Sequence, residues 1–78
     1  MDKIELLLSE IEVGQRKQLM SIGRRIIPFL TEEDILQPND YPELENNPHF
    51  RYEEGVLAGI QTVQMAIRSL KSSSILSK

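Results

Sequence analysis

Apolar side chains recur at helical spacing along residues 47–70. Steps of three or four residues place them on one face of an α-helix; they are Tyr52, Val56, Ile60, Val63, Ile67 and Leu70. Asn47 can accept a hydrogen bond from a free backbone amide at the helix start, and Pro48 has no amide that needs a partner. The pattern therefore predicts a long amphipathic helix over about residues 48–71.

A stripe of small side chains runs beside this apolar stripe. Its members are Gly55, Gly59, Thr62, Ala66 and Ser69. A glycine inside a helix costs about 1 kcal/mol relative to alanine, so two glycines one turn apart indicate a compensating close contact with another backbone. Alternatively, the helix begins after Gly59 and both glycines lie in a loop. Charged residues such as Glu53 and Arg68 interrupt the span, which excludes a membrane helix dimer.

Residues 2–27 predict a second long helix. Its apolar series has the same three- and four-residue steps, and comprises Ile4, Leu8, Ile11, Leu19, Ile22 and Ile26, with Gln15 in the middle. Leu6, Val13 and Met20 widen this stripe at seven-residue spacing. The first half of the helix is acidic and the second half basic, which suits the helix dipole and would equally suit antiparallel pairing with a second copy.

The segment between the two long helices carries helix-stop and turn signals. Pro28 ends the first helix because it has no amide proton and clashes with the preceding turn, and Phe29 and Leu30 are expected to continue onto the core. Thr31 and Asp34 have the spacing of a capping box, which predicts a short helix over about residues 32–37.

Residues 38–47 are rich in Pro and Asn and predict a loop. Tyr41 and Leu44 are the apolar side chains expected to anchor this loop to the helices. No segment alternates with a period of two, so the expected fold is all-α, a hairpin of two long helices. One domain is expected over residues 1–72, followed by a Ser-rich tail at 73–78 that frays.

This hairpin has more apolar surface than it can bury alone. The chain has 78 residues, no Cys and no Trp, and a single core in a chain of this size rarely supplies more than about 3–5 kcal/mol without staples. Two hairpins pairing as a homodimeric four-helix bundle would cover the surplus, and a different protein could take the same face. The residues assigned to this interface are Leu8, Ile11, Leu19, Ile22, Gly55, Val56, Gly59, Ile60, Val63, Ala66 and Ile67.

Composition places the chain among folded domains of reducing compartments. The net charge is −3, 40% of residues are hydrophobic and Cys is absent, so a cytoplasmic protein is expected. The first residues are too acidic for a signal peptide, and no stretch has the apolar length needed to span a bilayer.

Candidate chemistry is sparse, which favours a non-enzymatic interaction module such as an adaptor, a regulator or a small chaperone. His49 is the only histidine, and with neighbouring carboxylates it offers a weak metal or ligand site; a ligand set at fixed spacing is missing, so no cofactor or metal is expected. Paired glutamates lack any sign of a pocket that would tune them for acid–base catalysis.

Two further clusters have alternative interpretations. Arg16, Lys17, Arg24 and Arg25 form a basic cluster that would suit a nucleic-acid-associated regulator. Residues 31–54 hold eight acidic groups and one Arg, so nucleic acid is a weaker hypothesis than a solvated basic face. Residues Phe50, Arg51 and Tyr52 form either a recognition patch or an apolar plug at the loop end of the hairpin.

Overall fold

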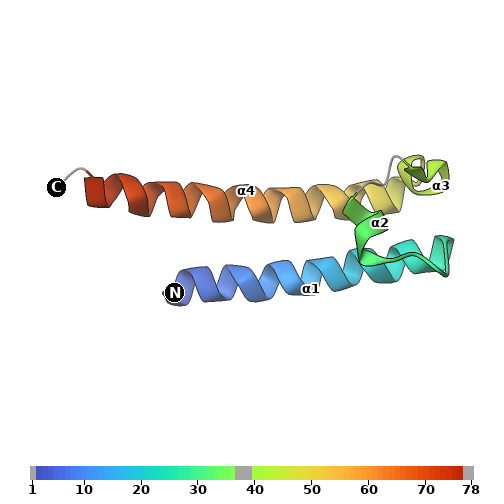
Figure 1. The fold of residues 1–78 in the computed structure, drawn as a ribbon, viewed down its shortest axis with the longest axis horizontal. Coiled ribbons are helices and arrows are strands. Elements are labelled where there is room, and N and C mark those ends of the chain that lie inside the picture. Colours follow the sequence, from blue (N-terminus) through green and yellow to red (C-terminus); the bar gives the residue numbers. More distant parts are fainter. Residues whose placement is uncertain (1, 37–39, 77–78) are drawn as a thin grey trace.

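The computed structural model describes residues 2–36 and 40–76, and within them the regular secondary structure is all helical, without a strand. Figure 1 shows four helices, α1 (Lys3–Ile26), α2 (Glu32–Leu36), α3 (Pro42–Glu45) and α4 (Pro48–Leu76). The predicted all-α fold with two long helices packed together is confirmed.

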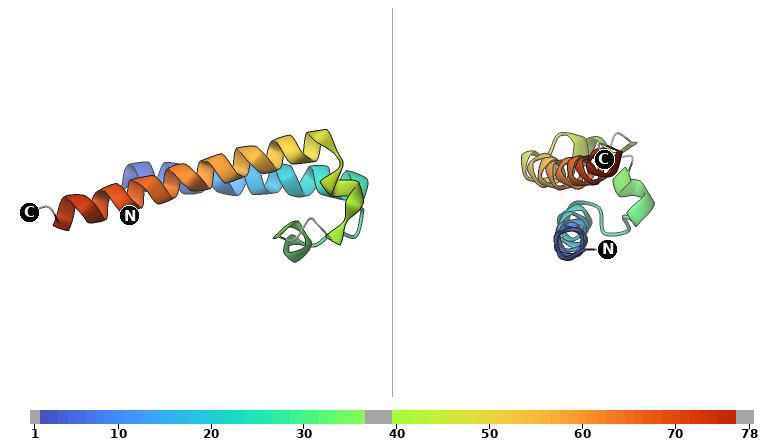
Figure 2. Two further views of the ribbon diagram at one scale, coloured as in Figure 1. Left: turned by 90° about the horizontal axis from the view of Figure 1, so that it is seen from above. Right: turned by 90° about the vertical axis from the view of Figure 1, so that its left-hand side faces the viewer.

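The two long helices lie side by side and antiparallel, as the views in Figures 1 and 2 show. The helices α2 and α3 are at the end where α1 finishes and α4 begins, which we call the loop end. At the other end, the open end, α4 continues past the start of α1. The molecule is therefore a rod, with extents of 50 × 20 × 19 Å.

Side-chain caps define the starts of α1, α2 and α4. The Asn47 side chain accepts a hydrogen bond from the Phe50 amide at 2.9 Å, and Asp2 caps α1 in the same way. Thr31 and Asp34 form a reciprocal pair: the Thr31 amide donates to Asp34 Oδ2 at 3.0 Å, and the Asp34 amide donates to Thr31 Oγ1 at 3.3 Å. The predicted cap at Asn47 and the predicted capping box are both confirmed.

The chain turns sharply after α1. The Ile27 amide still donates to the Gly23 carbonyl at 2.8 Å, and the Leu30 amide then donates to the Ile27 carbonyl at 3.1 Å. Leu30 is buried, whereas Phe29 is 76% exposed. The expectation that both side chains join the core is therefore wrong for Phe29, because the turn after Pro28 directs only one of the two adjacent side chains inward.

The hydrophobic core is confined to the loop end. Its buried members are Leu19, Ile22, Ile27, Leu30, Leu44 and Phe50, and Tyr41 and Ile35 pack against them. The predicted anchors Tyr41 and Leu44 are thus both in contact with this core. These residues come from α1, α3, α4 and the turns. The core therefore packs the connection between the two long helices against both of them.

The close backbone approach occurs at Gly23 rather than at Gly55 or Gly59. A Cβ atom on Gly23 would lie 2.5 Å from Leu30 Cδ2 and 3.3 Å from Ile35 Cδ1. A Cβ atom on Gly55 or Gly59 would meet nothing within 4 Å. Within one chain, the small stripe of α4 therefore has no close contact that offsets its helix-propensity cost.

Two element boundaries differ from the sequence-based expectation. The helix α3 forms within the predicted loop 38–47, where Pro42 occupies a first-turn position that needs no amide donor. The helix α4 continues to Leu76, through residues 73–76 of the expected tail, since serine neither removes a backbone donor nor blocks the helix sterically. Residues 37–39 of the predicted short helix and loop, and tail residues 77–78, lie outside the described residues.

Candidate interaction surfaces

Polar and apolar side chains share the middle and open end of the seam between α1 and α4. The side of α4 that turns toward α1 carries Glu53, Leu57, Ile60, Gln64, Ile67 and Lys71, all at least partly buried. This line shares Ile60 and Ile67 with the apolar stripe that begins at Tyr52, and its mean direction is rotated from that stripe by roughly a fifth of a turn. Consequently, part of that stripe points to solvent: Tyr52, Val63 and Leu70 are all exposed.

Glu12 is the central acceptor of the seam. Gln61 Nε2 donates to its Oε2 at 3.1 Å, and Gln64 Nε2 donates to its Oε1 at 3.3 Å. Arg16 adds an ion pair at 3.0 Å from the same helix. The hydrogen bond from Gln61 is the main reason that the pKa of Glu12 lies below its ordinary value, with Gln64 and Arg16 acting in the same direction.

Two further polar contacts fix the register of the hairpin. Gln15 Nε2 donates to the Glu53 carbonyl oxygen at 3.0 Å and to Glu53 Oε1 at 2.8 Å. At the open end, Lys71 Nζ bonds Asp2 Oδ2 at 2.7 Å and also bonds Glu5. The hydrogen bond with Lys71 is the largest cause of the lowered pKa of Asp2, and the hydrogen bond with Asp2 is the largest cause of the raised pKa of Lys71.

These contacts bear on the idea that the acidic half of α1 pairs with the basic half of a second copy. Asp2 and Glu5 are bonded to Lys71, and Glu12 is bonded to Gln61, Gln64 and Arg16. Three of the carboxylates that such pairing would need are already engaged within the hairpin. The charge pattern of α1 therefore contributes to intrachain register.

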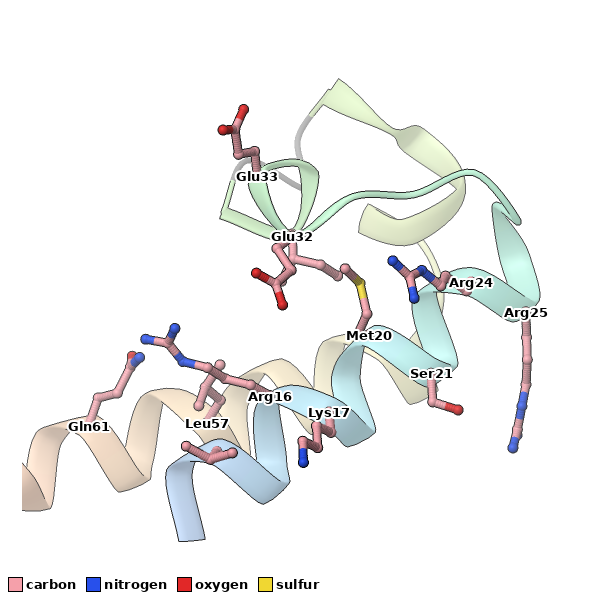
Figure 3. A pocket seen from close by; sticks show the side chains of 12 residues that line it. Arg16, Lys17, Met20, Ser21, Arg24, Arg25, Glu32, Glu33, Leu57 and Gln61 are labelled. Atoms are coloured by element: carbon pink, nitrogen blue, oxygen red, sulfur yellow. The ribbon is translucent and has the colours of Figure 1, made fainter. Parts of the chain in front are cut away.

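One side of the seam is hollowed into a groove between α1, α2 and α4, shown in Figure 3. The groove encloses about 910 Å³. Its apolar lining consists of Val13, Met20, Ile35 and Leu57, and its polar lining consists of Arg16, Lys17, Ser21, Arg24, Arg25, Glu32, Glu33 and Gln61. All four residues of the predicted basic cluster are thus among the lining residues, but the Arg25 side chain is directed away from α2 and from the groove (Figure 3).

The basic side chains of the groove differ in their engagement. Arg16 pairs with Glu12 but its side chain remains 58% exposed. Arg24 uses its Nε to donate to the Leu30 carbonyl at 3.0 Å, and Figure 3 shows its guanidinium on the side of α1 that faces α2. In the same view Glu32 lies over the groove, whereas Glu33 points away from α1.

The side of the hairpin opposite the groove carries no charged residue along α1 as far as Gln18, or along α4 from Tyr52 to Leu70. Arg25, seven residues after Gln18, continues this side of α1 beyond that stretch. Residues two positions apart on a helix point about 200° apart, so Ile11 faces away from the groove residue Val13, and Val63 faces away from the groove residue Gln61. Following the same three- and four-residue steps defines what we call the uncharged face: Ile4, Leu7, Ile11, Gly14 and Gln18 on α1, with Tyr52, Val56, Gly59, Val63, Ala66 and Leu70 on α4. Its large apolar members are mostly exposed.

The structure divides the residues that the sequence assigned to an interface. Leu19 and Ile22 are buried in the core of the hairpin itself, so they are not available to another chain. Leu8, Ile60 and Ile67 are half-buried along the seam, as is Val56. The exposed members are Ile11, Gly55, Gly59, Val63 and Ala66. All of these except Gly55, which points directly away from α1, belong to the uncharged face.

The three residues of the proposed recognition patch lie in three different surroundings. Phe50 is 0% exposed and is part of the core, so its place is that of an apolar plug. Arg51 pairs with Glu54 at 3.1 Å on the surface of α4. Tyr52 is 68% exposed and lies at one end of the uncharged face.

His49 lies near one carboxylate in the structure. Its Nε2 is 3.8 Å from Glu53 Oε2, and its side chain is 58% exposed. Glu53 itself is directed to Gln15. Among residues 2–36 and 40–76, no three His, Cys, Asp or Glu side chains are grouped so that they could hold a metal ion.

Sequence reasoning missed the polar seam and the groove as sites. The seven-residue spacing of Val13 and Met20 was the signal for the groove floor, since it marks a second apolar line on α1. For the seam, the only signal was glutamine and glutamate at inward positions of two otherwise apolar helices.

In the described residues, neither long helix contains an apolar run that could cross a lipid bilayer. Comparison with family models, with curated proteins and with solved structures finds no match to this chain.

Proposed function

We propose that the protein is a non-enzymatic interaction module in which two hairpins pair through their uncharged faces into a homodimeric four-helix bundle. The observation that carries this proposal is the exposure of apolar side chains on one side of the hairpin. Glu12, Gln15 and Lys71 share the seam with apolar residues, while other apolar residues such as Ile11 and Val63 point to solvent. The apolar side chains of an amphipathic helix are ordinarily turned toward a core.

The exposed area supports a partner of about the size of this chain. The chain exposes 5825 Å², whereas a compact monomer of 9.0 kDa would expose about 4,900 Å². The difference of about 900 Å² is close to the roughly 800 Å² per partner that a stable interface buries. An assembly through the uncharged face would remove this surplus from water.

A second copy is a suitable occupant because the face is uncharged on both helices. A two-fold axis brings each residue of the face against residues of the same face, so like charges would repel there. The steps of three and four residues along both helices are those of bundle packing. The exposed glycines Gly14 and Gly59 would let the backbones of two hairpins come close.

The experiment that tests the proposal compares two valine substitutions. Val63 is 47% exposed on the uncharged face, and Val13 is 48% exposed on the opposite side. Val63→Glu should convert the dimer to a monomer, because it buries an unpaired carboxylate in the interface. Val13→Glu should leave the dimer intact. The measurement is absolute mass by light scattering after size exclusion, over a concentration series.

The outcomes separate the possibilities. A monomeric wild-type chain at all concentrations would refute the homodimer. A dimer that survives Val63→Glu but not Val13→Glu would place the interface on the groove side. Circular dichroism of both variants shows whether the helices are retained, so loss of the fold is distinguished from loss of pairing.

The role that fits such a dimer is that of an adaptor, a regulator or a small chaperone. The lack of Cys supports placing it in the reducing cytoplasm. The proposal needs no cofactor and assigns no catalytic residue.

A further inference from the structure

The groove lies on the side of the hairpin that the proposed dimer leaves free. Its residues Val13 and Gln61 point away from the uncharged face, as helix geometry requires. Along α1 the groove runs from Val13 to Arg25, about 18 Å at the helical rise per residue. That length accommodates five or six residues of an extended peptide, at about 3.3 Å each.

The floor of the groove is apolar and its border is mostly positive. Val13, Met20, Ile35 and Leu57 can contact aliphatic side chains. Four basic and two acidic residues line the groove, and the side chains of Arg25 and Glu33 are directed away from it (Figure 3). Three basic residues then stand against Glu32, in a chain whose overall net charge is −3. The groove is thus a local concentration of positive charge on an acidic molecule, which attracts anions from solution.

We propose that this groove binds an acidic peptide segment of a partner protein, one that carries aliphatic side chains between its carboxylates. The aliphatic side chains contact the floor, and the carboxylates pair with the exposed Arg16 and with Lys17. This inference does not depend on the homodimer, because each groove is formed within one chain.

A nucleic acid fits the groove less well. No aromatic side chain is among the groove residues, so unpaired bases would find no stacking surface. Glu32 and Glu33 border the groove and would repel a continuous phosphate backbone. An acidic peptide has charges at intervals and can place an aliphatic side chain beside these glutamates.

Glu32 provides a second test, because removing its charge should change the affinity for acidic and for basic peptides in opposite directions. Its carboxylate lies over the groove (Figure 3), where it would compete with an incoming carboxylate for the same arginines. Removing that charge with Glu32→Gln should tighten binding of an acidic peptide, by about threefold if the effect is that of one partly solvated charge. A basic peptide would respond in the opposite direction.

The test uses a fluorescein-labelled decapeptide of alternating glutamate and leucine, titrated with the full chain and followed by fluorescence anisotropy. Arg16→Gln/Lys17→Gln should weaken binding about tenfold, as loss of two partly exposed ion pairs predicts. The control Lys3→Gln/Arg68→Gln removes the same charge from exposed positions outside the groove and should change affinity by less than about twofold. The mass of each variant is measured in parallel.

The possible results of this experiment each support or overturn the proposed peptide groove. Equal weakening in both double variants would show general charge attraction and overturn the groove. Absence of wild-type binding, or unchanged binding when serine replaces leucine in the peptide, would overturn it too. A thymidine oligonucleotide that binds as tightly as the peptide, and loses affinity with Arg16→Gln/Lys17→Gln, would assign the groove to nucleic acid. A monomeric wild type that binds the peptide would refute only the dimer.

Discussion

Gly23 lies where side chains from three other parts of the chain meet α1. A Cβ atom there would be 2.5 Å from Leu30, 3.3 Å from Ile35 and 3.5 Å from Phe50. Leu30 and Phe50 are buried in the core, so neither can move aside freely. Here glycine allows a close approach of the backbone to the core, although the residue is costly in a helix.

Alanine substitutions at two glycines of α1 should therefore have opposite effects. Gly14→Ala places its methyl group in open space and should raise the free energy of unfolding by about 0.5–1 kcal/mol through helix propensity. Gly23→Ala gains the same propensity but overpacks the core, at a cost of about 1–3 kcal/mol, and should lower stability by about 1 kcal/mol in balance. Urea unfolding followed by circular dichroism, at one fixed protein concentration, measures both. A stabilised Gly23→Ala variant would contradict the packing described at this position.

At the scale of the elements, the polar seam makes the stability of the hairpin depend on pH. The folded-state pKa values of Asp2 and Glu12 lie below their ordinary values of 3.8 and 4.5. Their contribution to stability is therefore complete above those ordinary values, and it is lost as pH falls through the lower folded-state values. Lys71 has a raised pKa, so its contribution is present below 10.5 and is lost as pH rises through the folded-state value.

The chain should therefore be most resistant to unfolding between about pH 5 and pH 10. Glu12→Gln should reduce the loss of stability between pH 7 and pH 3, because one of the titrating groups is gone. Glu10→Gln, an exposed residue of the same helix, serves as the control. Urea midpoints at a series of pH values give the comparison, and equal acid sensitivity of the wild type and Glu12→Gln would mean that Glu12 has no such role.

The sequence was sufficient to place α1, α2 and the start of α4, because local signals define them, but α3 was expected to be loop. The caps at Asn47 and Thr31 and the apolar steps of both long helices act within a few residues. The rotation of α4 against α1 was not predictable in the same way, because it depends on contacts between residues far apart, such as Gln15 with Glu53 and Gln64 with Glu12. Periodicity favoured Val63 as an inward residue, whereas matched hydrogen-bonding partners turned Gln64 inward.

The candidate sites, too, were predictable only where residues close in the sequence define them. The basic residues around the groove were evident as a cluster in the sequence, but the groove itself required α2 to fold back beside α1. For Phe50 the sequence left two alternatives, a recognition patch with Arg51 and Tyr52 or an apolar plug, and the position of the connection decides for the plug.

At the scale of the whole molecule, the two proposed interfaces lie on opposite sides of the rod, so one does not block the other. The uncharged face is proposed for a second copy, and the groove for an acidic peptide. Val63→Glu and Val13→Glu should separate them: the first abolishes pairing and keeps peptide binding, and the second keeps pairing and weakens peptide binding by placing a carboxylate on the groove floor. Loss of both properties in either variant would indicate that the two sides are not independent.

The confinement of the core to the loop end also determines how the molecule moves. Buried apolar contacts are concentrated around Leu19 and Phe50, whereas the open end is held by the partly exposed side chain of Lys71. Local opening is easiest where buried contacts are few, so the two helices should separate first at the open end and rotate about the core.

Hydrogen–deuterium exchange should reveal this motion as a gradient. Amides of residues 19–26 and 50–57 should exchange slowest, and amides near the start of α1 should exchange fastest. If pairing covers the open end, dilution below the dimer dissociation constant should accelerate exchange there and leave the loop end unchanged. A uniform rate along both helices would contradict the uneven distribution of stability. In the proposed dimer, each hairpin would thus hold the more mobile half of its partner closed. Assembly would then determine how often the two long helices separate at the open end.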